Sequence, residues 1–547
     1  MIERDGYRLE LARDGRRAVL GAPDGRHWLS IGLLSSFDRD GTADETVSFE
    51  SSEDGASIVL TRVSTAWERA GTTVTCGPDR IEIRSFVEGA GRLTDVHLLG
   101  GRGVFGPMTG LFRTGTSCTT LFSPNPGDPA KLVRPAAEEA VLGANGDGEL
   151  GRGNWFFSPP PLALAFRRGD ETEWLGLELT APVEELTFVQ AVHRPGDRAF
   201  HLTLEYDGHT QVEGRFEAPV VVLRPGLADP LDAVTAEHAP RAIPDWWRGG
   251  IFCGWGAQCH LSSRGDGPAP SLATQSNYDA FLGALAHHGV VPPTVVIDDK
   301  WQRTYGRNEP DEAKWPDLRG FIAERHAEGQ RVLLWWKAWD PEGLDPALCI
   351  RRPDGVPVAL DPSNPETQDL LRTVMRELIS PDGLDADGLK VDFTARTPSG
   401  RALTHHGPAW GIALLHLQLK VVYDAVKQAK EDALVITQTP HPGFGDATDM
   451  VRLNDMLRLD DPGPIPTAAV VPQMRYRAGV VRAALPDALV DTDDWTTPDK
   501  ATWREYLDAK RDLGVPSLYY ATHLDLTGES LDEDDYAAIR RAFGTTR

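Results

Sequence analysis

A regular alternation of strand and helix patterns in the second half of the chain constrains its fold more than any other feature. From about residue 251 onward, short apolar runs alternate with segments in which apolar residues recur at helical spacing. The first pattern predicts buried strands, and the second predicts helices with one buried face. Because each helix returns the chain to the end at which its strand began, successive strands are expected to lie parallel in one sheet.

Eight strands and seven helices are predicted in this half. The strands cover residues 251–254, 294–297, 331–335, 389–392, 434–437, 450–453, 489–490 and 517–520. The helices cover residues 276–288, 318–328, 365–379, 408–431, 466–484, 499–513 and 533–543. Eight strands in about 300 residues match a (β/α)₈ TIM barrel, an α/β fold. An open doubly wound sheet is the alternative, but no glycine-rich phosphate loop follows the first strand.

The first half of the chain shows a different pattern, in which apolar and polar residues alternate between turns rich in Gly, Asp and Pro. Such runs occur at 7–11, 56–60, 81–85, 162–166, 174–178 and 200–204. Alternation with period two predicts antiparallel strands, and an N-terminal antiparallel β-sandwich is the expected architecture. The proline-containing segment 239–244 separates the two patterns, so the predicted domains are a sandwich over 1–240 and a barrel over 245–547.

The charge of the chain limits the classes of partner. Fifty-six basic and 81 acidic residues give a formal net charge of −25, which argues against nucleic acid and against an anionic membrane surface. The N-terminus lacks an apolar signal core, and no apolar run is long enough to span a membrane. We therefore expect a cytoplasmic protein. The sequence leaves its oligomeric state open, a homo-oligomer included.

Cysteine and histidine usage gives no indication of a metal or a disulfide framework. The chain has five cysteines, an odd number, and they are widely spaced without a CxxC pair. No histidine pair accompanies the aspartates at the predicted strand ends, so metal-assisted hydrolysis is disfavoured. We expect neither a metal nor a cofactor.

The predicted strand at 389–392 carries two charges on one face. Lys390 and Asp392 are two positions apart, and residues with this spacing point to the same side of a strand. Charges on a core strand are costly unless they are paired or functional. A structural ion pair is one interpretation. The other is a catalytic carboxylate at the C-terminal end of a barrel strand, where barrel enzymes place their chemistry.

Further polar and aromatic residues follow the other predicted strands, and a barrel brings these strand ends together on one face. They are Trp255, Asp298, Asp299, Lys300, Trp301, Trp336, Lys337, Arg452, Asp455, Asp491, Asp493 and Asp494. A single tryptophan is more commonly part of a core than a ligand platform. A group of them beside carboxylates and cations favours a sugar site, because indole rings stack on sugars and charged groups bind hydroxyls. Two carboxylates from different strands suit glycoside hydrolysis.

Four stretches, in this order, resemble a clan of retaining α-glycosidases, glycoside hydrolase families 36, 27 and 31. The resemblance is closest to the α-galactosidase and raffinose-synthase type of family 36 and covers about 245–525. Residues 296–302 resemble the "DDGW" motif, and 388–392 and 452–455 resemble "KWD" and "RxSD". Residues 360–366, which precede the third predicted helix, also match.

The resemblance implies that Asp392 is the nucleophile and Asp455 the acid/base. Residues implied or predicted to contact a sugar are Asp298, Asp299, Lys390, Arg452, Trp255, Trp301, Trp336 and Lys337; Lys337 lies in the region where the family has glutamates. We expect Arg452 to face the sugar and not Asp455, because contact with that carboxylate would lower the pKa of the acid.

The function that the resemblance implies is retaining, exo-acting hydrolysis of small α-linked hexosides, with an α-galactosidase-like preference. The substrate would be an oligosaccharide or another glycoside. An α-glucosidase-type hydrolase and a transglycosidase share the same machinery and are the enzymatic alternatives. A catalytically silent carbohydrate-binding barrel is the alternative from another class.

Overall fold

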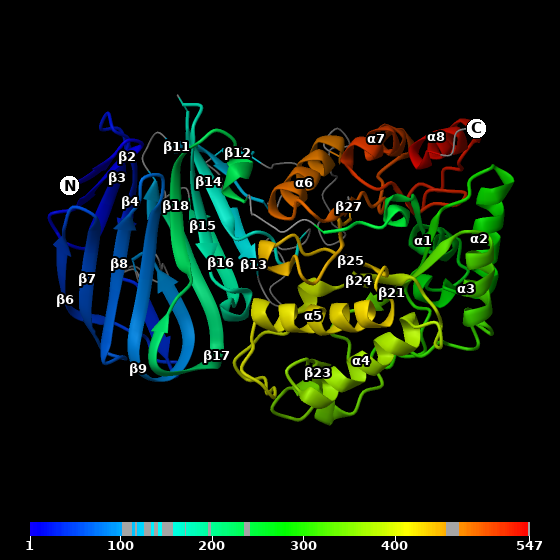
Figure 1. Ribbon diagram of the computed structural model, residues 1–547, viewed down its shortest axis with the longest axis horizontal. Coiled ribbons are helices and arrows are strands. Elements are labelled where there is room, and N and C mark those ends of the chain that lie inside the picture. The colour runs from blue at the N-terminus through cyan, green and yellow to red at the C-terminus, as the bar shows by residue number, and fades with distance from the viewer. Residues whose placement is uncertain are drawn as a thin grey trace.

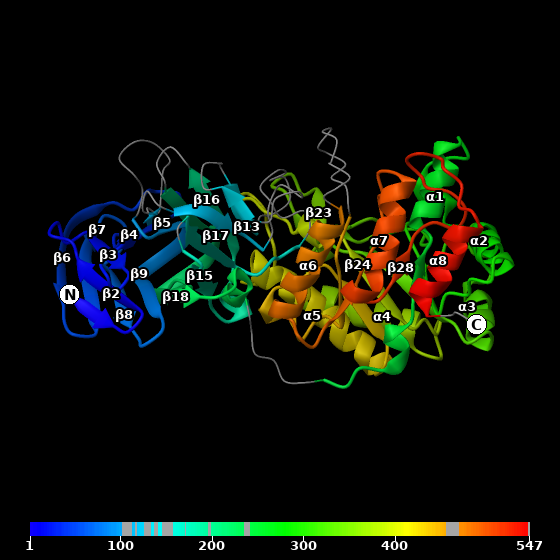
Figure 2. The ribbon, with the colours of Figure 1, turned by 90° about the horizontal axis from the view of Figure 1, so that it is seen from above.

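The computed structural model describes residues 1–100, 112–114, 118–124, 133–135, 140–144, 157–169, 171–194, 199–234, 241–455 and 470–544. It consists of two parts that lie side by side along the long axis (Figures 1 and 2). The N-terminal part is built from strands, and the C-terminal part from strands surrounded by helices. The N-terminus and the C-terminus lie at opposite ends of the molecule.

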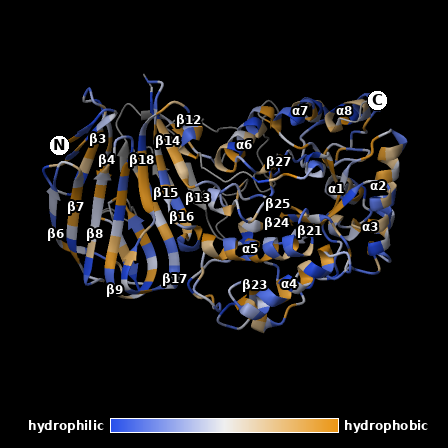
Figure 3. Cartoon of the chain, in the orientation of Figure 1, coloured by the Kyte–Doolittle hydropathy of each residue, from blue (hydrophilic) through white to orange (hydrophobic). Residues whose placement is uncertain are grey.

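The N-terminal part is antiparallel, as the alternating pattern predicts. Its long strands β9 (Ile81–Leu98) and β17 (Ala199–Glu217) pair with each other along most of their length. Along β7 (Ser57–Ser64) buried and exposed residues alternate, and Figure 3 shows such alternation on its neighbours. One face of each strand is therefore available for a core. The remaining described strands are β1 (Ile2–Arg4), β2 (Tyr7–Leu11), β3 (Arg17–Gly21), β4 (His27–Gly32), β5 (Ser36–Arg39), β6 (Thr46–Glu53), β8 (Arg69–Cys76), β10 (Phe112–Thr114), β11 (Cys118–Phe122), β12 (Val133–Pro135), β13 (Ala140–Ala144), β14 (Ala163–Arg168), β15 (Trp174–Thr180), β16 (Phe188–Arg194) and β18 (Val220–Leu227).

The C-terminal part is a parallel barrel, which confirms the predicted fold class. Within the described residues, eight strands pair in the order β27-β26-β25-β24-β21-β20-β19-β28. A parallel bridge between Asp491, at the end of β27, and Val515, two residues before β28, links the two ends of this order and nearly closes the barrel. The strands are β19 (Ile251–Cys253), β20 (Thr294–Ile297), β21 (Arg331–Lys337), β24 (Gly388–Asp392), β25 (Leu434–Thr437), β26 (Met450–Arg452), β27 (Leu489–Asp491) and β28 (Ser517–Leu518).

Helices cover the outside of the barrel (Figure 1). In the part of the chain that the structure describes they are α1 (Trp255–Ser263), α2 (Gln275–His287), α3 (Leu318–Ala327), α4 (Pro365–Ile379), α5 (Ile412–Ala429), α6 (Val470–Ala484), α7 (Lys500–Leu513) and α8 (Glu533–Phe543). Helix α1 was not predicted, because its buried residues include Gly256, Gln258 and His260 and so carry no apolar period. The link from β25 to β26 holds only a 3₁₀ turn, Pro442–Phe444, and is too short for a full helix, as predicted.

The loop that follows β24 joins the barrel to the sandwich. Gly400 N donates to Asp207 Oδ2 at 3.0 Å, and the rings of His405 and His209 share a hydrogen bond of 3.0 Å. The loop begins directly after Asp392, so the sandwich supports the segment that leaves the central strand of the candidate site.

Among the described residues no helix is long and apolar enough to cross a membrane.

Candidate active site

Strand β24 lies at the centre of the candidate site and carries both of its singled-out charges inward. Its neighbour β21 pairs with it so that Trp335 lies beside Lys390 and Lys337 beside Asp392. Gly388 opens the strand with φ 151°, and a Cβ atom there would approach Leu434 O to 2.0 Å. Only glycine therefore allows β24 and β25 to lie this close at the base of the site.

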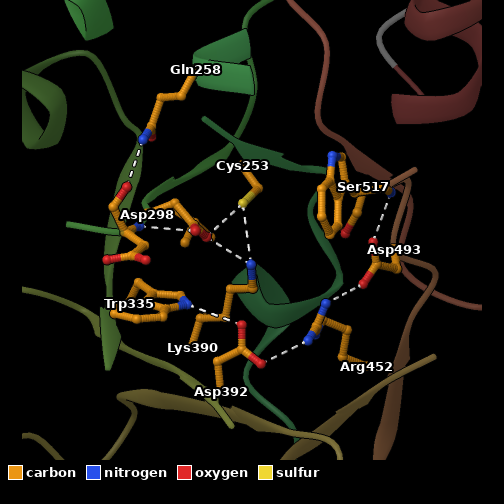
Figure 4. A network of polar contacts seen from close by, with 12 residues as sticks. Cys253, Gln258, Asp298, Trp335, Lys390, Asp392, Arg452, Asp493 and Ser517 are labelled. Atoms are coloured by element: carbon orange, nitrogen blue, oxygen red, sulfur yellow. Dashed lines mark hydrogen bonds and ion pairs between the residues drawn. The ribbon is translucent and has the colours of Figure 1, made fainter. Parts of the chain in front are cut away.

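Lys390 forms an ion pair, but with Asp298 and not with Asp392. Its Nζ donates to Asp298 Oδ2 at 2.7 Å, and both side chains are only 3% exposed. Cys253 Sγ donates to the same carboxylate oxygen at 3.0 Å (Figure 4). Burial alone would lower the pKa of Lys390, but the electrostatic effects of Asp298, Cys253 and Asp392 together outweigh it and raise the pKa. We call Lys390 and Asp298 the Lys390 pair.

Arg452 lies among three carboxylates from three strand ends. Its Nη2 contacts Asp392 Oδ1 at 3.1 Å, while its Nη1 contacts Asp493 Oδ2 at 2.6 Å and Asp455 Oδ1 at 3.2 Å. Gln438 Oε1 also accepts from Nη2, at 3.1 Å. Figure 4 shows Arg452 between Asp392 and Asp493. We call Arg452, Asp392, Asp455 and Asp493 the Arg452 group.

The surroundings of Asp392 favour the ionised carboxylate. Burial opposes ionisation, but the positive charges of Arg452 and Lys390 outweigh it and lower the pKa of Asp392 below its usual value. Phe393 N donates to Oδ1 at 2.8 Å and Trp335 Nε1 to Oδ2 at 3.2 Å. Asp392 is therefore suited to act as an anion at neutral pH.

The surroundings of Asp455 favour its protonated form. Burial raises the pKa of Asp455, Arg452 opposes this, and the negative charges of Asp493 and Asp392 raise it further, to about 7. Its side chain is 34% exposed, more than that of Asp392 at 21%. The two carboxyls thus share one guanidinium, while their pKa values move in opposite directions.

Asp299, beside the Lys390 pair, lies on the same face of the barrel. It accepts a hydrogen bond from Tyr305 Oη at 2.8 Å, and burial raises its pKa to about 6. Lys337 Nζ lies 4.0 Å from the centre of the Tyr305 ring and pairs with Asp340 at 2.8 Å. Asp299 and Lys337 are thereby connected through Tyr305 at the ends of two adjacent strands.

The three predicted tryptophan platforms are placed differently from one another. Trp301 is fully buried and donates from Nε1 to Trp335 O at 2.8 Å, and Trp336 is 1% exposed, so neither offers a ring face in this structure. Trp255 is half-buried, with its ring centre 5.8 Å from that of Trp495. Of the three, only Trp255 has an exposed part that could contact a sugar.

The expected orientation of Arg452 is wrong. Its guanidinium contacts both candidate catalytic carboxylates instead of facing away from Asp455. The reason is Asp493, which is fully buried after β27 and binds the guanidinium at 2.6 Å. The role of Asp493, like the contacts of Trp335 and Cys253, was missed. The run of acidic residues after β27 was a signal for Asp493, but it did not reveal which carboxylate points inward.

Comparison with known proteins supports the fold and goes no further. No protein-family model matches the chain, and no curated protein matches it. Among solved structures, the α-N-acetylgalactosaminidase NagBb from Bifidobacterium bifidum, bound to GalNAc, is 12% identical; the match covers 99% of this chain and 92% of that one, with a TM-score of 0.59. An α-galactosidase from Thermus thermophilus, bound to stachyose, is 14% identical over 90% of this chain and 99% of that one, with a TM-score of 0.53.

A third structure has the same two-part architecture. A GH31 family sulfoquinovosidase from E. rectale, bound to an aza-sugar inhibitor, is 12% identical over 99% of this chain and 81% of that one, with a TM-score of 0.56. All three likenesses extend across both the sandwich and the barrel. At such identities they show that the chain has this fold, a β-sandwich followed by a (β/α)₈ barrel.

Proposed function

We propose that the protein is a retaining α-glycoside hydrolase in which Asp392 is the nucleophile and Asp455 the acid/base. The observation that carries this proposal is the opposite shift of two carboxyl pKa values around one guanidinium. Pairs of titratable groups whose pKa values are pushed apart are typical of an acid and an anionic partner in catalysis. The fold-level analogy with an α-galactosidase, an α-N-acetylgalactosaminidase and a sulfoquinovosidase adds support.

The proposed reaction has two steps. In the first, a carboxylate oxygen of Asp392 attacks the anomeric carbon while Asp455 gives its proton to the leaving oxygen, and the bond to the leaving group breaks. A glycosyl-enzyme with a β-linkage forms. In the second, Asp455 takes a proton from water, the water oxygen attacks from the α face, and Asp392 leaves. The released sugar keeps the α configuration of the substrate.

The proposed substrate is a small α-linked hexoside cleaved from its end, with an α-galactoside as the first candidate. Asp299 would accept hydrogen bonds from sugar hydroxyls, and Lys337 would donate to them. The Lys390 pair would act mainly by holding Asp392 anionic, because its own polar atoms contact each other. We propose no metal or cofactor, since the two carboxyls together supply the attack and the proton transfer.

Aryl α-glycosides of galactose, glucose and N-acetylgalactosamine test the class and the sugar, with and without excess acceptor sugar. Release of phenol with free sugar supports a hydrolase, and release with a new glycoside supports a transglycosidase. Binding without release of phenol supports a silent carbohydrate-binding barrel. If the wild type releases the β-sugar first from an α-substrate, the double displacement is wrong and Asp392 becomes the base that activates water.

Azide rescue tests the two roles separately. Azide added to Asp392→Gly is expected to attack the α-substrate directly and to give a β-glycosyl azide. Azide added to Asp455→Gly is expected to attack the β-linked glycosyl-enzyme and to give an α-glycosyl azide. The opposite assignment of products would exchange the roles of the two aspartates.

A further inference from the structure

An arginine of helix α6 holds the backbone that carries Asp455. Arg477 is 2% exposed, and its Nη1 donates to the carbonyl oxygens of three successive residues. The distances are 2.6 Å to Leu453 O, 3.0 Å to Asn454 O and 2.9 Å to Asp455 O. One nitrogen atom therefore fixes the whole turn that follows β26.

The turn needs such support because of its conformation and its neighbours. Asn454 has φ 66°, in the left-handed region that non-glycine residues rarely adopt. Leu453 N donates to Asp491 O at 2.9 Å, and this bond ties the start of the turn to β27. The carbonyl of Asp455 contacts Arg477 while its carboxyl contacts Arg452 at 3.2 Å, so two arginines hold the backbone and the side chain of one residue.

A cation buried at this position is expensive unless it is compensated. Burial lowers the pKa of Arg477 to about 9. The three carbonyl dipoles on Nη1 offset part of this cost, because hydrogen bonds from a charged donor are stronger than neutral ones. An apolar residue would fill the same helix face without this cost, yet Nη1 of Arg477 places three hydrogen bonds on the Asp455 turn.

We infer that Arg477 is a positioning residue for Asp455, in that it fixes the turn so that the acid/base carboxyl stays against Arg452 and within reach of the leaving oxygen. The inference rests on the proposed function of Asp455. Nη1 of Arg477 contacts the backbone of the turn, whereas the guanidinium of Arg452 touches the carboxyl of Asp455 itself.

Dependence on the leaving group separates positioning from a general structural role. A poor leaving group such as phenoxide needs the proton of Asp455, whereas dinitrophenoxide leaves without it. Displacement of Asp455 should therefore slow cleavage of the phenyl α-glycoside far more than cleavage of the dinitrophenyl α-glycoside of the same sugar. A loss of stability alone would lower both rates by the same factor.

The experiment compares Arg477→Gln with Arg482→Gln, a matched control on the same helix. Arg482 also donates from Nη2 to two carbonyl oxygens, Asp512 O at 2.7 Å and Leu513 O at 2.8 Å, away from the site. We expect Arg477→Gln to lose about 100-fold in kcat/KM on the phenyl glycoside, and less than about threefold on the dinitrophenyl glycoside. Arg482→Gln should keep both rates.

Arg477→Lys keeps the positive charge and a donor nitrogen at the end of a long side chain, so it should restore part of kcat/KM on the phenyl glycoside. Thermal unfolding of each variant shows whether it is folded. If Arg477→Gln does not fold, the same ratio of the two substrates in Arg477→Lys decides the question. Equal losses on both substrates, or the same ratio in Arg482→Gln, overturn the inference while the wild type remains active. A wild type that cleaves neither glycoside overturns the proposed function, and this inference with it.

Discussion

The Lys390 pair and the Arg452 group lie side by side in the barrel, yet they differ in their balance of charge. The Lys390 pair has one cation and one carboxylate, and both side chains are 3% exposed. In the Arg452 group one cation meets three carboxylates, of which Asp392 and Asp455 are partly exposed. In a balanced buried pair each charge has its partner, so both groups stay ionised. An excess of carboxylates forces at least one of them toward its protonated form near neutral pH.

This difference explains why the chemistry is proposed for one cluster and not for the other. Both cations lower the pKa of Asp392, but only Arg452 touches it. Burial raises the pKa of Asp455, and the negative charges of Asp493 and Asp392 raise it further. Lys390 therefore lowers the pKa of Asp392, the proposed nucleophile, without touching it, while within the Arg452 group the pKa of Asp392 falls and that of Asp455 rises.

The largest effect is expected from Arg452→Gln, which removes the only cation of the Arg452 group. Removal of one partner of a buried ion pair costs about 3–5 kcal/mol. Without Arg452, the folded-state pKa values of Asp392 and Asp493 should rise above their unfolded values. The contribution of these two carboxyls to the free energy of unfolding is then present at low pH and is lost as the pH rises through the folded-state pKa. In urea unfolding, the free energy of unfolding of Arg452→Gln should lie below that of the wild type at about pH 7, and the difference should be smaller at about pH 5. A deficit independent of pH would contradict the charge imbalance.

A somewhat smaller loss, about 3 kcal/mol, is expected from Lys390→Met, because Asp298 is then left buried without its cation. The double variant Lys390→Met/Asp298→Asn should recover much of this loss, since no charge remains to be buried. The two changes should therefore be strongly coupled in a double-mutant cycle measured by denaturant unfolding. Additive losses would show that the pair is not a unit. The acid limb of kcat/KM should also move to higher pH in Lys390→Met, because this lysine lowers the pKa of Asp392.

Asp299→Asn is expected to cost less, about 2 kcal/mol of transition-state binding, the value of a charged hydrogen bond. The effect should depend on pH, because the pKa of Asp299 is about 6 and only the ionised form gives the strong acceptor. The ratio of wild-type to variant kcat/KM should thus be largest above pH 6 and shrink below it. Asp298→Asn is the matched comparison, and we expect it to lower stability more than substrate binding. The reverse pattern in the two variants would exchange their roles.

The sequence predicted the fold well because periodicity decides it. The bounds of all eight strands were predicted to within a few residues. The predicted strand 517–520 is the shorter strand β28, Ser517–Leu518, in the structure. The site was predicted less completely, because spacing tells which strand end a residue occupies but not what its side chain contacts. Arg452 was expected to face a sugar, and only the position of the buried Asp493 reveals otherwise. The domain boundary near residue 240, the catalytic roles, the substrate and the cellular location stay predictions.

The tryptophans show the same limit. Trp301 and Trp336 were predicted as sugar platforms but are buried, whereas Trp335, which was not predicted to be a site residue, contacts Asp392. Adjacent residues on a strand point to opposite faces, so a shift of one position along β21 exchanges core for site. Cys253 was likewise not predicted to be a site residue, although its thiol donates to Asp298.

The smallest predicted effect follows from this correction. Trp335→Phe removes the indole N–H that lies 3.2 Å from Asp392 Oδ2 and keeps an aromatic ring in the core. One hydrogen bond is worth about 1 kcal/mol, so kcat/KM should fall about fivefold. The bond also lowers the pKa of Asp392, so the acid limb of the pH profile should move to higher pH. Trp336→Phe, one position along the same strand, is the matched control and should leave the acid limb in place. If both variants lose activity without a change in the pH profile, Trp335 is a packing residue, and Arg452 and Lys390 alone keep Asp392 ionised.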